Sequence, residues 1–158
     1  MSPKSSRVII TKGPEETMAL GEHLAGELEP GACLALIGEL GAGKTTFIKG
    51  LARGLEIPEE EVLSPSFILV REYRRGRLPL YHVDAYRITK PGELREIGLE
   101  EYLLSEGITV IEWADRLPRA ILQGCLEVRL EILSENERRI TIVPVRPGPD
   151  GPKGPCSG

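Results

Sequence analysis

The chain has 158 residues, of which 41% are hydrophobic and 28% charged, and its formal net charge is −4. This length suits one domain and this composition is ordinary for a globular protein, so disorder throughout the chain is excluded. The acidic balance argues against a protein whose main task is to grip nucleic-acid phosphates, because that task needs a basic face. No apolar run approaches the roughly 18–20 residues of a membrane span, and residues 1–11 lack the apolar core of a secretory signal. We therefore expect a soluble, cytoplasmic protein that makes no contact with membranes.

The hydrophobic pattern of the first third of the chain predicts two strands that alternate with two helices. A short strand is expected at 7–12. After a Gly-Pro break, leucines four residues apart mark one face of a helix, which the Pro30-Gly31 pair should end. The apolar run 32–37 is typical of a strand covered on both faces, hence of a parallel sheet. Residues 44–55 have the 3–4 spacing of an amphipathic helix.

The rest of the chain adds antiparallel pairs and short helices. Two hairpins are expected, and between them a helix that begins at Pro91, a short helical turn at 100–105 and a buried strand at 108–113. The first hairpin pairs 67–73 with 80–83 through an irregular basic turn, and the second pairs 126–133 with 138–145. The pattern as a whole predicts a single α/β domain, whose mixed sheet has a parallel centre, antiparallel additions and flanking helices.

Composition also separates a tail from this domain. The chain has 18 glycines and 13 prolines, and eight of these residues fall in the last twelve positions. We therefore predict one packed domain over residues 1–146 and a disordered, Gly/Pro-rich tail over 147–158.

The three cysteines do not predict a disulfide or zinc scaffold. Their number is odd, and no two of them have metal-chelating spacing. Cys33 and Cys125 border apolar runs and read as small core hydrophobes in a reducing compartment, whereas Cys156 lies in the tail.

The strongest motif is the segment GELGAGKT at 38–45, which fits the pattern G-x-x-x-x-G-K-[ST] without a gap. A buried strand is predicted before it and an amphipathic helix after it, which is the context that a phosphate-binding loop requires. The glycines let successive N–H groups point into one concavity, and the helix adds its positive N-terminus. Lys44 would reach the β- and γ-phosphates, and the Thr45 hydroxyl would bind Mg²⁺. The fold is therefore expected to be P-loop NTPase-like.

Such a protein also needs an acidic residue near the metal, at the carboxyl end of a neighbouring buried strand. Asp84 follows one predicted strand and Glu112 closes another. Their types and positions alone do not decide which role each would have. Glu112 could also be an exposed residue at a strand end, and Asp84 could be a helix or turn cap.

Several segments in this order resemble the bacterial TsaE (YjeE) ATPases. They are GELGAGKTTF, SPSF-x-LV, YHVDAYR, E-x-GLEEY and IEW, and the resemblance runs from about residue 9 to residue 145. It implies an ATP-binding and ATP-hydrolysing accessory protein that supports threonylcarbamoyl modification of the adenosine beside the anticodon of ANN-decoding tRNAs. It also implies that TsaB and TsaD are partners and carry out the transfer, so that tRNA is met only through their complex.

The resemblance also implies roles for individual residues. Asp84 and Lys44 would be catalytic, with Asp84 placing or deprotonating the attacking water. Thr45 and Glu112 would ligate Mg²⁺. Residues Ser64, Ser66 and Phe67 resemble a switch-like loop that faces the γ-phosphate. The ATP contacts would come from one residue near the first helix, on the adenine side, and from the phosphate loop: Thr17, Glu39, Leu40, Gly41, Ala42, Gly43, Lys44, Thr45 and Thr46.

Two side chains near these positions have alternative interpretations. His82 lies one strand period from Asp84, so it is expected to orient Asp84, although a general base is conceivable. Trp113 could lie near the nucleotide, in a partner interface or simply in packing. The basic turn with Arg71, Arg74, Arg75 and Arg77 is interpreted as a solvated hairpin tip, with tRNA or a protein partner as alternatives.

Two other functions share the phosphate loop. A small-molecule or nucleoside kinase would carry a mobile lid with several arginines; Arg116 and Arg119 are the nearest candidates, and no long inserted lid is present. A non-enzymatic module would use ATP only as a switch, but the retained Lys44, Thr45, Asp84 and Glu112 argue against it.

Overall fold

The computed structural model describes residues 6–39, 41–58, 70–86 and 91–145. The predicted tail and the switch-like loop with Ser64, Ser66 and Phe67 lie outside these residues. The strands are β1 (Arg7–Thr11), β2 (Cys33–Gly38), β3 (Val70–Tyr73), β4 (Leu80–Asp84), β5 (Ile108–Glu112), β6 (Leu126–Ile132) and β7 (Arg138–Pro144). The helices are α1 (Pro14–Ala25), α2 (Lys44–Gly54), α3 (Pro91–Glu96) and α4 (Leu99–Leu104), with 3₁₀ turns η2 (Ala114–Arg116) and η3 (Arg119–Leu122).

The seven strands form one mixed sheet in the order β1-β7-β6-β2-β5-β4-β3. β2 pairs in parallel with β5 on one side and with β6 on the other, and β4 continues the parallel centre beyond β5. β3 on one edge and β7 with β1 on the other are antiparallel. The predicted α/β fold, with a parallel centre and antiparallel additions, is confirmed.

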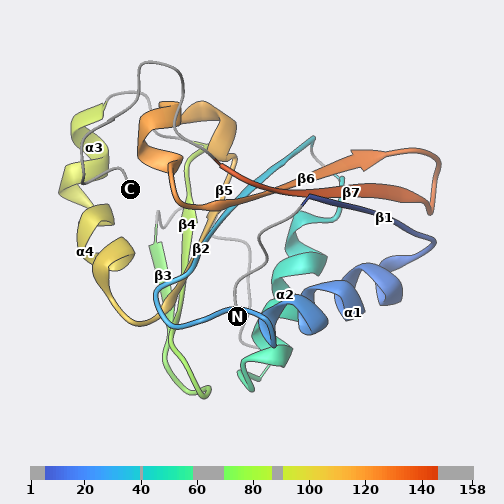
Figure 1. The fold of residues 1–158 in the computed structure, drawn as a ribbon, viewed down its shortest axis with the longest axis horizontal. Helices are drawn as coiled ribbons and strands as arrows, with labels where there is room; N and C mark the ends of the chain where they lie inside the picture. Colours follow the sequence, from blue (N-terminus) through green and yellow to red (C-terminus); the bar gives the residue numbers. More distant parts are fainter. Residues whose placement is uncertain (1–5, 40, 59–69, 87–90, 146–158) are drawn as a thin grey trace.

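The sheet separates two hydrophobic cores (Figure 1). Leu34 and Leu36 of β2 contribute to the core under α1 and α2, whereas Cys33, Ala35 and Ile37 contribute to the core shared with α4, η2 and η3. Alternation along β2 thus sends side chains to two covered faces, which is why its sequence is continuously apolar. Among the described residues, no helix is long and apolar enough to cross a membrane.

Helices α1 and α2 pack unusually closely because glycines lie between them. A Cβ added to Gly50 would lie 2.0 Å from the carbonyl oxygen of Met18, and one added to Gly21 would lie 2.4 Å from the carbonyl oxygen of Phe47. Both contacts are with backbone, which has little room to move. The close approach fixes α2, and with it the phosphate loop, against the N-terminal helix.

Four elements differ from the sequence prediction. α1 ends at Ala25 rather than at Pro30-Gly31, because the N–H of Gly26 closes a turn onto the His23 and Leu24 carbonyls, while Leu28 stays buried beyond the helix. The strand predicted at 108–113 ends at Glu112, because Trp113 has a left-handed backbone (φ 59°). The turns η2 and η3 were not predicted, since each spans only three or four residues.

We expect Gly50→Ala to lower the free energy of unfolding by about 3 kcal/mol, because a methyl group would press on helix backbone. The matched control is Gly92→Ala in α3, where an added Cβ meets nothing within 4 Å. It should change stability by less than about 1 kcal/mol, in the stabilising direction. Urea unfolding of both variants measures the difference, and equal stabilities would contradict the close packing.

Candidate functional site

The predicted phosphate loop connects β2 to α2. Its backbone needs glycine, since Gly41 and Gly43 have φ values of +84° and +103°, in the left-handed region. A Cβ on Gly38 would lie 2.8 Å from the carbonyl oxygen of Leu130 in β6. Leu40 lies outside the described residues. The turn therefore brings the N-terminus of α2 to the carboxyl edge of the parallel strands, where anions bind in sheets of this kind.

Lys44 is held inside the loop rather than extended into solvent. Its ammonium group donates hydrogen bonds to the carbonyl oxygens of Gly38 and Glu39, the latter at 3.1 Å, and its side chain is almost fully buried. The ammonium nitrogen also lies 3.9 Å from the ring centroid of Trp113, in a cation–π contact. Lys44 thus has three internal partners within the described structure.

Burial and the nearby charges change the pKa of Lys44 in opposite directions. Burial lowers the pKa of Lys44 below its usual value, whereas the carboxylates of Glu112, Asp115 and Asp84 raise it. Burial is the largest of these effects. All three acidic residues are therefore close enough to Lys44 to interact electrostatically with it.

The two predicted acidic residues lie side by side at the strand ends. Asp84 and Glu112 are paired positions on the parallel strands β4 and β5, and Glu112 is also paired with Leu36 of β2. Glu112 is only 6% exposed, so it is not an exposed strand-end residue. Asp84 is half-buried, and its carboxylate accepts a hydrogen bond from the N–H of Tyr86 at 2.9 Å. Asp84 therefore caps the turn after β4 as well as facing the site.

His82 is bonded to Glu112, whereas the sequence predicted that it would orient Asp84. Its Nε2 donates to the Glu112 carboxylate at 2.7 Å, and the His82 side chain is completely buried. Its Nδ1 has no hydrogen-bond partner among the described atoms. The reason is the parallel register: His82 is paired with Val110, two positions before Glu112, so the two side chains lie on the same side of the sheet. His82 thus fixes one carboxylate oxygen of Glu112.

Thr17 lies beside the loop, as the resemblance implied. Its hydroxyl group hydrogen-bonds the hydroxyl group of Thr11 at 2.7 Å, and it borders a cavity of about 130 Å³. The wall of this cavity combines α1, the loop and the β6–β7 turn: Gly13, Pro14, Thr17, Gly41, Gly43, Thr46, Glu135, Asn136 and Arg138. The arrangement brings Thr17, Gly41, Gly43 and Thr46 of the predicted ATP contacts together.

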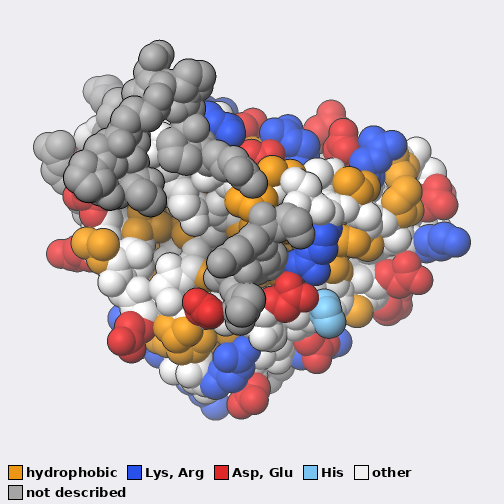
Figure 2. Space-filling model, in the orientation of Figure 1, with side chains coloured by type: hydrophobic (Ala, Val, Ile, Leu, Met, Phe, Trp, Pro, Cys, Tyr) orange, Lys and Arg blue, Asp and Glu red, His pale blue; other side chains and the backbone are white. Residues whose placement is uncertain are grey.

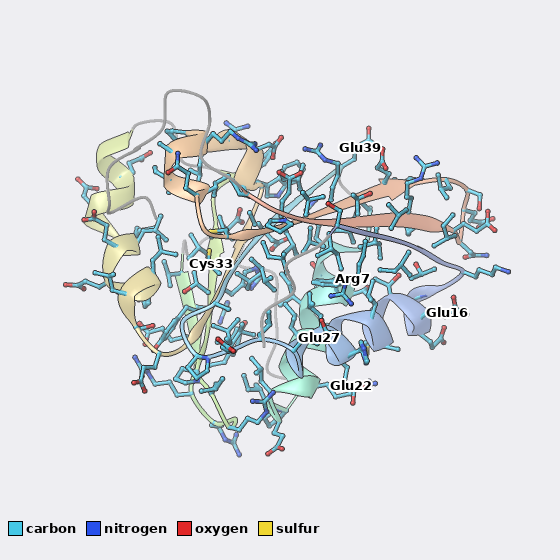
Figure 3. The ribbon with its side chains drawn as sticks, viewed as in Figure 1. Arg7, Glu16, Glu22, Glu27, Cys33 and Glu39 are labelled. Carbon is cyan, nitrogen blue, oxygen red and sulfur yellow. The ribbon has the colours of Figure 1, made fainter. Side chains whose placement is uncertain are left out.

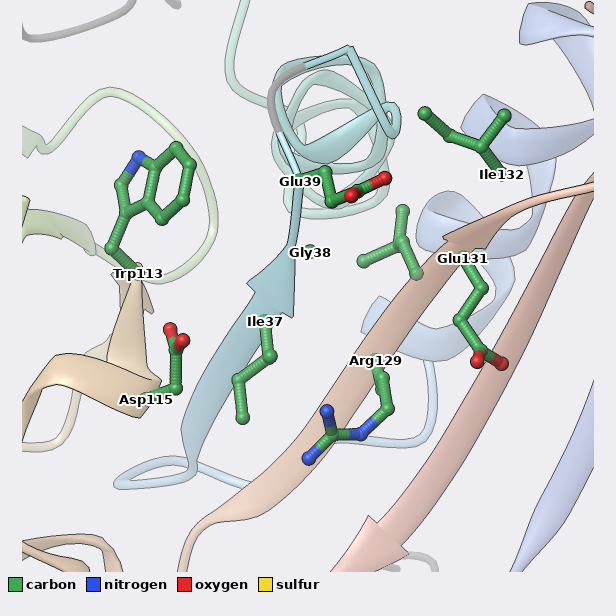
Figure 4. Close-up of a pocket in the computed structure, with 9 residues that line it drawn as sticks. Ile37, Gly38, Glu39, Trp113, Asp115, Arg129, Glu131 and Ile132 are labelled. Carbon is green, nitrogen blue, oxygen red and sulfur yellow. The ribbon is translucent and has the colours of Figure 1, made fainter.

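A larger cavity of about 460 Å³ borders the loop at Gly38 and Glu39 (Figure 4). Glu39, Asp115 and Glu131 bring three carboxylates to its wall, and Arg129 brings one guanidinium. Arg129 is itself paired with Glu127 at 3.0 Å. Glu131 is likewise paired with Arg139 at 3.4 Å, so the excess negative charge of the wall comes from Glu39 and Asp115.

Aromatic side chains extend from Lys44 toward the surface. Tyr86 packs on Trp113 with ring centroids 4.9 Å apart, and the guanidinium of Arg116 lies 5.3 Å from the Tyr86 ring. The contact with Lys44 places the Trp113 ring beside the phosphate loop, and a position near the nucleotide stays a prediction. The IEW segment was the only sequence signal for this position, and nothing predicted the role of Tyr86.

The basic turn is partly used inside the molecule. Arg77 donates to the carbonyl oxygens of Gly54 and Ala25, at the ends of α2 and α1, and Arg74 pairs with Glu72 at 2.8 Å. On the face shown in Figure 2, positive and negative side chains of the described residues alternate over the surface. These contacts agree with a structural hairpin tip better than with a tRNA-binding patch.

The donor set suits Mg²⁺ bound together with phosphates. Thr45 in the first turn of α2 and Glu112 at the end of β5 offer hard oxygen atoms, which Mg²⁺ prefers. No group of three or more His, Cys, Asp or Glu side chains in the described part could hold a metal by itself. A metal here would therefore take its remaining ligands from phosphate and water, as Mg²⁺ commonly does.

Sequence reasoning missed Arg138. Its guanidinium donates to the Gly41 carbonyl at 3.1 Å and to the Ser134 carbonyl at 2.8 Å, so it ties the phosphate loop to the β6–β7 turn. Arginine in an alternating strand reads as a solvent-facing residue, and no local pattern distinguishes this one.

We expect His82→Ala to destabilise the protein by about 3 kcal/mol, because the buried Glu112 carboxylate would lose its donor. His82→Gln is the matched control, since the glutamine amide can donate from nearly the same position as Nε2. Thermal unfolding of the two variants tests this. If both lose the same stability, the hydrogen bond contributes nothing beyond the volume of the ring.

Comparisons with known proteins agree on one family. The family model described as threonylcarbamoyl adenosine biosynthesis protein TsaE matches residues 11–140. The tRNA threonylcarbamoyladenosine biosynthesis protein TsaE of Bacillus subtilis is 42% identical over 135 residues, which cover 85% of this chain and 84% of that protein. The protein of the same name from Treponema pallidum is 38% identical over 133 residues, which cover 84% and 97%.

A solved structure supports the same family assignment. The crystal structure of Bacillus subtilis YdiB superposes with a TM-score of 0.70 at 36% identity, covering 92% of this chain and 89% of that one. By sequence and by structure, this chain belongs to the TsaE family.

Proposed function

We propose that this chain is the ATP-hydrolysing accessory protein of tRNA threonylcarbamoyladenosine biosynthesis, and that it acts on a TsaB–TsaD complex. The observation that carries the proposal is the convergence of Lys44, Glu112 and Asp84 at the phosphate loop of a TsaE family member. Contact with tRNA would be indirect, through the complex, which agrees with a net charge of −4.

The residues divide the work as follows. Lys44 and the N–H groups of the loop hold the phosphates, and the cavity beside Thr17 receives the nucleoside. Thr45 and Glu112 hold Mg²⁺, which when bound neutralises charge on the phosphates. Asp84 holds the attacking water. This role is supported by its half-buried position beside Glu112, and by the fact that His82 bonds Glu112 and not Asp84. His82 keeps Glu112 in one orientation.

Two arginines near the loop, within the described residues, support a requirement for partners. Arg138 is engaged by backbone carbonyls and Arg116 lies on Tyr86, so neither is directed at Lys44. In other P-loop enzymes, an arginine supplied by a partner accelerates hydrolysis by about 10³–10⁵-fold. The carboxylates of Glu39, Asp115 and Glu131 around the larger cavity would receive such a basic side chain.

The structure does not favour the kinase alternative. Arg116 and Arg119 belong to the short turns η2 and η3. Ala114 of η2 and Leu122 of η3 are buried in the second core, so both turns are part of the domain body. A kinase lid would have to move freely over the phosphates.

The proposal predicts slow release of phosphate from ATP by the isolated protein and faster release when TsaB and TsaD are added. Lys44→Ala should reduce the rate by at least about 10²–10³-fold with and without partners, because it removes the main protein cation from the phosphates. A colorimetric phosphate assay measures this, with a nucleoside panel as acceptors to detect transfer. Rapid turnover by the lone chain that TsaB and TsaD do not change would contradict the requirement for partners. Transfer to a nucleoside would support a kinase instead.

Glu112→Gln and Asp84→Asn should differ in kind. Loss of a metal ligand should weaken binding of Mg²⁺–ATP, whereas loss of the carboxylate that holds water should leave binding intact and slow hydrolysis. Fluorescence of Trp113, the single tryptophan, can follow binding because its ring contacts Lys44. If Asp84→Asn loses binding and Glu112→Gln retains it, the two roles are reversed.

A further inference from the structure

The two buried cysteines face each other at the amino-terminal ends of β2 and β6, which is the end of these strands opposite the phosphate loop. Cys33 is the first residue of β2, and Cys125 directly precedes β6. The next residues, Leu34 and Leu126, are paired positions on these parallel strands. The two thiols are hydrogen-bonded to each other, and both side chains are nearly inaccessible. In Figure 3, Cys33 and Glu39 mark opposite ends of the segment that contains β2.

The backbone arrangement suits a covalent link. Neighbouring strands lie about 4.8 Å apart, and disulfides join residues whose Cα atoms are about 4.4–6.8 Å apart. Both cysteines point to the same side of the sheet, in the core that also contains Val145. No strand would have to shift its register for the two sulfurs to bond.

A small cavity gives reagents a route to the pair. It has a volume of about 100 Å³, and its wall includes Cys33, Cys125, Ala32 and Gly124. Because the cavity borders both cysteines, it marks the side from which a small disulfide would approach the sulfurs.

We propose that Cys33 and Cys125 form a reversible intrachain disulfide by exchange with a low-molecular-weight disulfide. In the first step one cysteine sulfur, after losing its proton, attacks the small disulfide; a mixed disulfide forms and one small thiolate leaves. The second cysteine sulfur, also deprotonated, then attacks the mixed disulfide and expels the second small thiolate. The two protons end on the two small thiols, and the small disulfide receives the two electrons that the protein loses.

Both cysteines stay reduced until such a disulfide is present, and the exchange is then slow. The hydrogen bond to Cys125 and burial raise the pKa of Cys33 well above its ordinary value, so its thiolate is scarce at neutral pH and the exchange is slow. Once formed, the bond would join positions 92 residues apart. Such a long closed loop restricts the unfolded chain strongly, so the oxidised protein should be the more stable form.

The test uses the full chain with Cys156→Ser, which removes the tail cysteine. The folded protein is incubated with oxidised glutathione, blocked with iodoacetamide under denaturing conditions and examined by intact mass and peptide mapping. We expect loss of two hydrogen masses, a Cys33–Cys125 cross-linked peptide and a melting temperature about 10 °C higher, reversed by dithiothreitol. The matched control adds Cys125→Ser, which should show no cross-link and no rise in melting temperature.

Two outcomes would overturn the proposal. One is full alkylation of both cysteines after prolonged incubation of the folded protein, and the other is a stable glutathione adduct on either cysteine without the cross-link. This inference does not depend on nucleotide hydrolysis. Phosphate release by the reduced and oxidised forms can therefore be measured in parallel without affecting either conclusion.

Discussion

Parallel pairing on both sides of β2 is the constraint from which the rest of the site follows. With β5 on one side and β6 on the other, β2 is a central strand, and the two hydrophobic cores cover both of its faces. The loop after it must therefore emerge at the edge that also carries Glu112 and, one strand further, Asp84. The glycines between α1 and α2 hold the other side of this loop, since only hydrogen fits between the two helices.

Lys44 is restrained in advance in this arrangement. Its hydrogen bonds to the Gly38 and Glu39 carbonyls and its contact with Trp113 limit its rotamers, which reduces the entropy lost when it engages a phosphate. The same contacts have to be exchanged for contacts with the ligand, so part of the binding free energy is offset. The environment of Trp113 and the position of Lys44 are thereby coupled.

Much of this could be predicted from the sequence where the signal is local. The phosphate loop, the central strand and the two acidic residues each follow from a short motif or a continuous apolar run. The hydrogen bond between His82 and Glu112 could not be predicted, because these residues are 30 positions apart and their contact depends on the register between β4 and β5. The end of α1 also differs from the prediction. The turn at Gly26 ends the helix before Pro30-Gly31, and Leu28 is buried although it lies beyond the helix. Arg138 acts on a loop 97 residues away, which no local pattern records.

The position of β1 at the sheet edge affects how the protein can be made. Within the described structure β1 is the first strand, yet its hydrogen-bond partner is β7, the last one. During synthesis β1 therefore leaves the ribosome long before its partner exists, and β2 likewise waits for β5 and β6. Because contacts that are distant in sequence form slowly, the sheet can close only after β7 has emerged. Until then the exposed strand edges are open to pairing with other chains, and a chaperone that shields nascent β1 and β2 would raise the yield of folded protein.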